Sequence, residues 1–184
     1  YYSGSSGAGT QMTDFTGYNV AKKVSTSSSI RNDQAVYRPY IHIRYAEILL
    51  NYAEAMNEWK GPDATAEGCP LSAREALNQV RDCADMKHVT ENGTDFTAKV
   101  RNERRIELAF EGHRFYDIRR WKIAGLDEVR NLYGVKITKS GTSLSYEKVL
   151  LQQMYWNDKM YLFPYPQNEI YMNPDLGQNP GWST

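Results

Sequence analysis

The chain has 184 residues, which suits a single domain and is long enough to bury a hydrophobic core. Its 22 basic and 22 acidic residues cancel, so the molecule as a whole lacks the positive field that draws proteins onto nucleic acid or anionic lipid. No apolar run approaches the roughly 18 residues that a membrane-spanning helix needs.

Residues 1–37 are rich in Gly, Ser, Thr and Asn, and they predict an irregular leader with at most a short strand in GYNVAKKV. The first residues, YYSGSSGAGTQ, contain neither an initiator Met nor a basic segment followed by an apolar one. We therefore expect the chain to be an internal piece of a longer protein.

A helical pattern begins at about Ile41 and predicts a helix to Lys60, where Gly61-Pro62 ends it. Ser72 and Glu75 form a capping box at the start of a second helix, which continues to about Met86. The two helices resemble a tetratricopeptide-type hairpin. The connecting loop is longer than in that repeat, however, and no second copy occurs at a fixed period.

Two further helices are predicted before residue 126. The third runs from about Asp95 to Glu111, with Thr94 or Asp95 as its cap, and the fourth runs from about Arg114 to Ile123.

After Val129 the segments YGVKI, SLSYEKVLL and KMYLFPYP predict strands, with a turn at Lys139-Ser140-Gly141. The tail QNEIYMNPDLGQNPGWST contains two Asn-Pro pairs, which favour irregular coil.

The segment VRNERRIELAFEGHRFYDIRRWK (residues 100–122) interleaves arginines with glutamates and aromatics. A nucleic-acid-binding face is disfavoured, because Glu103, Glu107 and Glu111 lie at i, i+4 and i+8 and would place carboxylates where phosphates approach. Paired carboxylates can hydrolyse glycosides, but three like charges beside arginines are explained more simply by ion pairing. No catalytic triad, phosphate loop or metal-ligand spacing is present, so no active site is visible, and no cofactor or metal site is expected.

The remaining interpretation of this segment is structural. Arginines that flank a core can bind carboxylates and the carbonyls of neighbouring helix ends. The residues expected to face that core are Ile106, Ala109 and Phe110, continued by Phe115, Ile118 and Trp121. The segment thus indicates a charged clamp in an α-rich domain, and replacing Glu107 or Arg114 with Ala should lower its stability.

RNERRIELAFEGHRFYDIRRW resembles the signature of the SusD/RagB family of Bacteroidetes outer-membrane lipoproteins. IRYAEILLNYAEAMNE upstream, LFPYPQNEI downstream and NPDLGQNPGW at the end resemble further family segments in the same order. The matched positions are interpreted as a structural signature: Arg44, Glu47, Glu54, Arg104, Arg105, Glu107, Glu111, Arg114, Asp117, Arg120 and Trp121.

The resemblance implies a mainly α, SusD-like fold with tetratricopeptide-like helix pairs, long loops and a small β-hairpin. It implies that residues 1–184 are the C-terminal region of a longer protein. Residues 1–37 would be an irregular leader, 38–125 a helical core, and 126–184 a hairpin and coil tail.

The same resemblance implies a non-catalytic protein of polysaccharide utilisation. Family members capture glycans or other nutrients at the cell surface and deliver them to a SusC-like, TonB-dependent transporter of the outer membrane. The expected partners are that transporter, an oligosaccharide or other nutrient, and the missing N-terminal half. A lipidated N-terminal cysteine anchors such proteins, and neither Cys69 nor Cys83 has that context, so anchoring is expected of the parent protein only. The alternative is a helical protein-interaction module with no small-molecule ligand.

A sugar ring stacks its apolar face on Trp or Tyr while its hydroxyls pair with polar side chains. Tyr155, Trp156 and Asn157 combine these groups outside the matched motifs, and Tyr18 lies in the leader. We take these four residues as the candidate ligand contacts, although a hairpin turn explains the first three equally well. The aromatic residues inside the matched motifs, Trp121, Phe163 and Trp182, are expected to pack.

Overall fold

The structure, a computed structural model, describes residues 16, 18, 20, 22–23, 25, 27, 32–33, 35–37, 40–173 and 175–182. Most of the predicted leader, including half of the segment GYNVAKKV for which a short strand was suggested, lies outside these residues. The chain divides into two compact units: residues 25–114 form one, and residues 1–24 with 115–184 form the other. The described part is mainly helical and carries one two-stranded sheet.

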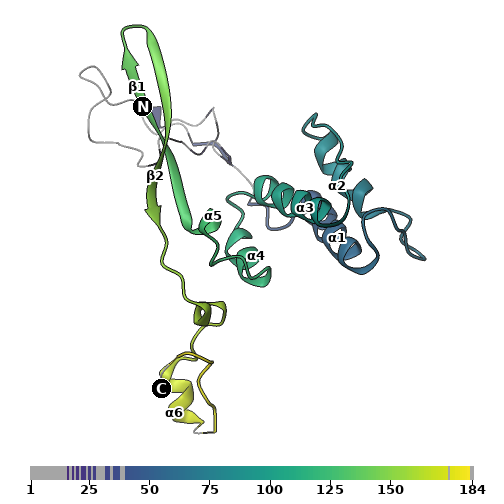
Figure 1. The fold of residues 1–184 in the computed structure, drawn as a ribbon, viewed down its shortest axis with the longest axis vertical. Coiled ribbons are helices and arrows are strands. Elements are labelled where there is room, and N and C mark those ends of the chain that lie inside the picture. Colours follow the sequence, from purple (N-terminus) through teal and green to yellow (C-terminus); the bar gives the residue numbers. More distant parts are fainter. Residues whose placement is uncertain are drawn as a thin grey trace. The chain divides into compact units, whose positions relative to one another are not determined.

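The unit of residues 25–114 is built from α1 (Tyr45–Lys60), α2 (Ala73–Asp82) and α3 (Gly93–Glu107), which Figure 1 shows side by side. Both α2 and α3 pack on α1, so α1 is the central helix of the unit. The buried residues come from all three helices and from the segments beside α3: Leu49, Leu50, Ala53, Met56, Ala73, Ala76, Leu77, Val80, Val89, Phe96, Val100 and Leu108.

The ends of α1 and α2 are set by local backbone interactions. Helix α1 begins four residues later than predicted, because Arg44 has an extended backbone (φ −132°, ψ 159°). Gly61 ends α1 at φ 88°, where its N–H donates to the Asn57 carbonyl. The capping box of α2 is confirmed: the Ser72 side chain accepts from the Glu75 N–H, and the Ser72 N–H donates to the Glu75 carboxylate at 2.8 Å.

Helix α3 differs from its predicted range at both ends. It begins at Gly93 after Asn92, so the expectation that Thr94 or Asp95 caps it was wrong. It ends at Glu107, and the chain then turns through Phe110, whose φ is 62°. The spacing of i, i+4 and i+8 predicted that Glu103, Glu107 and Glu111 share one helical face. Glu111 lies beyond the end of α3, so it does not belong to that row.

This early end of α3 also overturns part of the predicted core. Ile106, Phe110 and Phe115 are 58%, 70% and 43% exposed. Phe110 lies beyond the end of α3, so it no longer shares a helical face with Ile106, and Ile106 itself lies on the exposed side of α3. The residues that α3 and its end bury instead are Phe96, Val100 and Leu108.

The second unit contains most of α4 (Arg114–Arg120), then α5 (Asp127–Arg130), β1 (Asn131–Ser140), β2 (Ser143–Gln153), the 3₁₀ helix η2 (Asp158–Tyr161) and α6 (Gln167–Met172). Strands β1 and β2 pair antiparallel and confirm the predicted hairpin (Figure 1). Its two-residue turn begins at Gly141, whose φ of 60° suits such a connection. The predicted turn began two residues too early, because Lys139 and Ser140 still pair with β2.

Two sequence predictions for this unit were wrong. KMYLFPYP forms no strand: it contributes to η2 and then runs as coil, because Pro164 and Pro166 lack the N–H that a ladder needs. The tail is not entirely coil, since Pro166 precedes the short helix α6.

The outer edge of β1 is approached by the chain at Thr16. The Val135 N–H donates to the Thr16 carbonyl at 2.9 Å. A Cβ on the buried Gly134 would lie 2.7 Å from that oxygen and 2.6 Å from Leu151 Cδ1. Only glycine therefore admits this close approach.

Candidate functional site

A charged cluster ties the start of α1 to the end of α3. The Arg44 Nε donates to Glu111 Oε2 at 2.8 Å, its Nη1 binds the Glu107 carboxylate, and its Nη2 donates to the Glu107 carbonyl. Hydrogen bonding to Glu111, and then to Glu107, raises the pKa of the Arg44 guanidinium. One side chain thus satisfies two carboxylates and a carbonyl at a helix end.

Two more arginine contacts join the helices of this unit. Arg81 of α2 binds the buried Glu103 carboxylate of α3 and donates to the Lys87 carbonyl at 2.7 Å. Buried Arg104 donates to Asn51 of α1. The glutamates of residues 100–122 therefore bind arginines that lie outside that segment. Sequence reasoning included Arg44 but missed Arg81, for which helical spacing alone contains no signal.

His113 lies between a cation and an anion. Its Nε2 is 3.6 Å from Glu47 Oε2, and its Nδ1 is 3.5 Å from Arg104 Nη2. Since Arg104 can only donate, this geometry assigns Nδ1 as the acceptor and Nε2–H as the group facing Glu47.

The remaining signature residues occupy varied environments. In α4, Arg120 Nε donates to Asp117 Oδ1 at 2.9 Å, Asp117 is buried, and Arg120 lies over the Trp121 ring at 4.7 Å. Arg105 is exposed and donates to Asn102 at 3.1 Å. Glu54 and Arg114 are half-buried.

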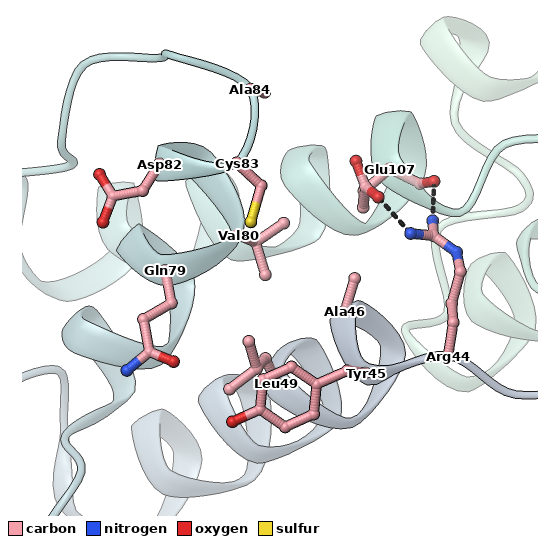
Figure 2. A pocket seen from close by; sticks show the side chains of 10 residues that line it. All are labelled: Arg44, Tyr45, Ala46, Leu49, Gln79, Val80, Asp82, Cys83, Ala84 and Glu107. Carbon is pink, nitrogen blue, oxygen red and sulfur yellow. Dashed lines mark hydrogen bonds and ion pairs between the residues drawn. The ribbon is translucent and has the colours of Figure 1, made fainter.

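A pocket of about 530 Å³ opens between the start of α1 and the end of α2. Figure 2 shows Val80 of α2 facing Ala46 and Leu49 of α1, with the Arg44–Glu107 pair at one side and the Asp82 carboxylate directed away. Its full lining is Arg44, Tyr45, Ala46, Leu49, Gln79, Val80, Asp82, Cys83, Ala84 and Glu107. Apolar walls beside a neutralised ion pair suit an apolar group better than an anion.

The four candidate ligand residues lie in the second unit. Tyr155 and Tyr18 are 72% and 63% exposed. Trp156 instead packs on Gly125, Tyr161 and Arg119. The centroids of the Trp156 and Tyr161 rings are 4.8 Å apart. The Asn157 Oδ1 accepts from the Lys159 N–H at 3.1 Å and caps η2. Of these residues, the two tyrosines are the ones that present an aromatic ring to solvent.

Two aromatic residues of the same unit, which sequence reasoning assigned separately to packing, form an exposed pair. Phe115 and Phe163 stack with centroids 5.9 Å apart and 18° between their planes, and the Arg119 guanidinium carbon lies 3.6 Å from the Phe115 centroid. Phe163 is 61% exposed, so packing accounts for only part of its surface. Trp182 does pack: its indole N–H donates to the carbonyls of Lys159 and Leu162 at 3.1 and 3.0 Å.

Within the residues that the structure describes, no group of three or more His, Cys, Asp or Glu side chains is arranged to hold a metal ion. Across the same residues, none of the helices has the length and apolar character needed to cross a bilayer.

Comparison with known proteins decides the family. The family model described as "SusD family" matches residues 1–182. The chain belongs to the SusD family. SusD-like protein P2 from Formosa agariphila is 31% identical over 146 residues, which are 78% of this chain and 26% of that protein. SusD-like protein P38 from the same organism is 30% identical over 131 residues, 64% of this chain and 23% of that protein.

A crystal structure of a SusD-like protein from Bacteroides fragilis has the same fold, with a TM-score of 0.65 and 38% sequence identity. The match covers 77% of this chain and 26% of that one, so the chain spans about a quarter of the length of the relatives it matches. Proteins of the SusD family have in general a nutrient-binding role. Such proteins are in general outer-membrane lipoproteins that associate with SusC-like transporters.

Proposed function

We propose that this chain is part of a non-catalytic protein that captures oligosaccharide at the outer membrane and delivers it to a TonB-dependent transporter. The observation that carries the proposal is the SusD-family match over residues 1–182. The charged cluster supports it, because Arg44, Glu107 and Glu111, which the signature contains, hold the helices of the unit together. A scaffold of this kind leaves the ligand contacts to loops.

The ligand contact proposed within these residues is Tyr155, with Trp156 and Asn157 fixing the loop that presents it. Tyr155 offers an exposed ring face for an apolar sugar face, while the packing of Trp156 and the cap made by Asn157 hold the backbone that follows it. Tyr18 is a second proposed contact, on the basis of its exposure and its place in the same unit.

A glycan-binding screen tests this assignment, followed by titration of the best ligand against variants. Tyr155→Ala should weaken binding at least tenfold. Tyr171→Ala is the matched control, because Tyr171 is 73% exposed and lies on α6. Equal affinities for the two variants would place the site elsewhere, and release of reducing ends from the ligand would contradict a non-catalytic role.

Delivery to a transporter, lipid anchoring and packing against an N-terminal half are proposed for the parent protein. Co-purification of that protein with a TonB-dependent transporter from outer-membrane extracts would support the partnership. Recovery of the parent without any such transporter, under conditions that preserve membrane complexes, would count against it.

One observation favours the alternative of a helix-docking module. The face of α1 that points away from the core carries Tyr45, Ile48 and Trp59, which are 69%, 50% and 66% exposed. Their spacing of i, i+3 and i+14 places them on one stripe, which could take an apolar helix, including one from the missing half. Loss of self-association or of hydrophobic-dye binding in Ile48→Ser, with sugar binding absent throughout, would favour this module.

A further inference from the structure

The β1–β2 hairpin separates its apolar from its polar side chains. Residues directly opposite each other in an antiparallel pair lie on the same face of the sheet. The register therefore places four pairs on one side, here called the apolar face: Tyr133 with Leu150, Val135 with Lys148, Ile137 with Tyr146, and Lys139 with Leu144. The other side, called the polar face because polar side chains predominate on it, receives Gly134 with Val149, Lys136 with Glu147, Thr138 with Ser145, and Ser140 with Ser143.

The apolar face is open to solvent. Tyr133, Leu144, Leu150 and Tyr146 are 44%, 47%, 55% and 66% exposed, although they form one contiguous surface on two paired strands. Water contact at this many large apolar side chains is unfavourable, and a two-stranded sheet is marginal until something covers one of its faces. The backbone contact at Thr16 lies along the edge of β1.

Charge is distributed unevenly over the hairpin. Its strands carry three lysines and one glutamate, a net charge of +2 in a chain whose total is zero. Lys139 and Lys148 share the apolar face, whereas Glu147 lies on the polar face. The Lys148 ammonium is 4.0 Å from the Tyr133 ring centroid, so its stem runs across the apolar surface. Although the chain as a whole is neutral, the apolar face of the hairpin is therefore cationic.

The composition of this face distinguishes between kinds of partner. Lysine is depleted from the cores of protein–protein interfaces, where its charge would lose water without gaining a partner. At a bilayer surface the same residue is favourable, because its stem lies along acyl chains while its ammonium reaches the phosphates. Tyrosine is likewise enriched at that depth, and aliphatic side chains enter the acyl boundary.

We propose that the apolar face of the β1–β2 hairpin binds the surface of an anionic lipid bilayer. The hairpin lies flat, with Tyr133, Ile137, Tyr146 and Leu150 entering the acyl boundary and with Lys139 and Lys148 at the level of the phosphates. The edges of the strands stay among hydrated headgroups, so N–H and C=O groups at those edges keep hydrogen-bond partners. The polar face remains in water. This binding is independent of sugar capture, and loss of either activity leaves the other intact.

The test is co-sedimentation of the full chain with large vesicles of phosphatidylcholine, with and without phosphatidylglycerol. Binding is expected to the anionic vesicles, to be weaker with phosphatidylcholine alone, and to fall as salt is added. Lys148→Gln and Lys139→Gln should each reduce the partition coefficient about fivefold, the equivalent of one surface lysine. Tyr146→Ser should reduce it further, because it removes an embedded ring.

Matched controls lie on the polar face. Lys136→Gln removes the same charge, and Ser145→Ala changes a neighbouring side chain, so both should leave most of the binding intact. Far-UV circular dichroism checks that each variant folds. Equal losses for Lys136→Gln and Lys148→Gln would show unoriented charge attraction and overturn the proposal. Absence of vesicle binding, with self-association that Tyr146→Ser abolishes, would assign the face to a protein contact and overturn it as well.

Discussion

Arg44 and Glu107 are 63 residues apart in the sequence, and the Arg44 guanidinium binds both the carboxylate and the carbonyl of Glu107. Arg44 stands one residue before α1, and Glu107 is the last residue of α3. The contact therefore joins the beginning of the central helix to the end of the helix packed on it. Since Glu111 binds the same guanidinium, the junction is a three-residue network.

Removing one member of this network should destabilise the helical unit. Arg44 and Glu107 side chains are only 27% and 29% exposed, so Glu107→Ala leaves the guanidinium without one of its carboxylates in a partly desolvated place. We expect a loss of about 2 kcal/mol in the free energy of unfolding, measured by urea denaturation. Lys99→Ala, which removes the exposed Lys99–Glu91 pair, should change it by less than about 0.5 kcal/mol. Equal effects of the two variants would contradict the network.

The core of α3 gives a second test. Phe96 is fully buried and Ile106 is 58% exposed, although both are large apolar residues of the same helix. Phe96→Ala should cost about 3 to 5 kcal/mol because it leaves a cavity, whereas Ile106→Ala should cost less than about 1 kcal/mol. Thermal unfolding of both variants checks this. A larger loss at Ile106 would restore the core that sequence spacing predicts.

The capping box of α2 predicts a dependence of stability on pH. Hydrogen bonds from the Ser72 N–H and hydroxyl lower the pKa of the Glu75 carboxyl below its usual value. The unfolded chain therefore takes up this proton at a higher pH than the folded one does. The stabilisation from Glu75 is fully present above the ordinary carboxyl range, near pH 4.3, and is lost as the pH falls through the lowered pKa.

Glu75→Gln should consequently be less stable than the parent at neutral pH, and the two melting temperatures should converge in acid. Ser72→Ala, which removes the cap hydroxyl, should lower the free energy of unfolding by about 1 kcal/mol at neutral pH. Melting curves that stay equally far apart from pH 7 to acid would rule out the proposed linkage.

Gly134 allows a test of the edge contact of β1. Gly134→Ala would place its Cβ 2.7 Å from the Thr16 carbonyl, so that segment must move and the Val135–Thr16 hydrogen bond should be lost. We expect hydrogen exchange at the Val135 amide to accelerate at least tenfold. Gly177→Ala, where the new Cβ meets nothing within 4 Å, serves as the control. Unchanged protection of Val135 in Gly134→Ala would show that the Thr16 contact does not hold this edge.

The sequence by itself determined the features that depend on neighbouring residues. Helices α1 and α2, the Ser72–Glu75 capping box, the stop at Gly61 and the hairpin turn at Gly141 follow from hydrogen bonds and backbone preferences that act within a few positions. The long charged signature likewise indicated the family, because its residue types and their order are read without any fold.

Only the tertiary structure decided which distant groups meet. It brought Arg44 to Glu107 and Arg81 to Glu103, and it packed Trp156 against Gly125 while leaving Tyr155 exposed. It also ended α3 at Glu107 and left Ile106 and Phe110 exposed. The physical reason is the range of the interactions: spacing determines which side chains share a face of one helix, but the partner of that face is chosen by packing among segments that are far apart in the chain.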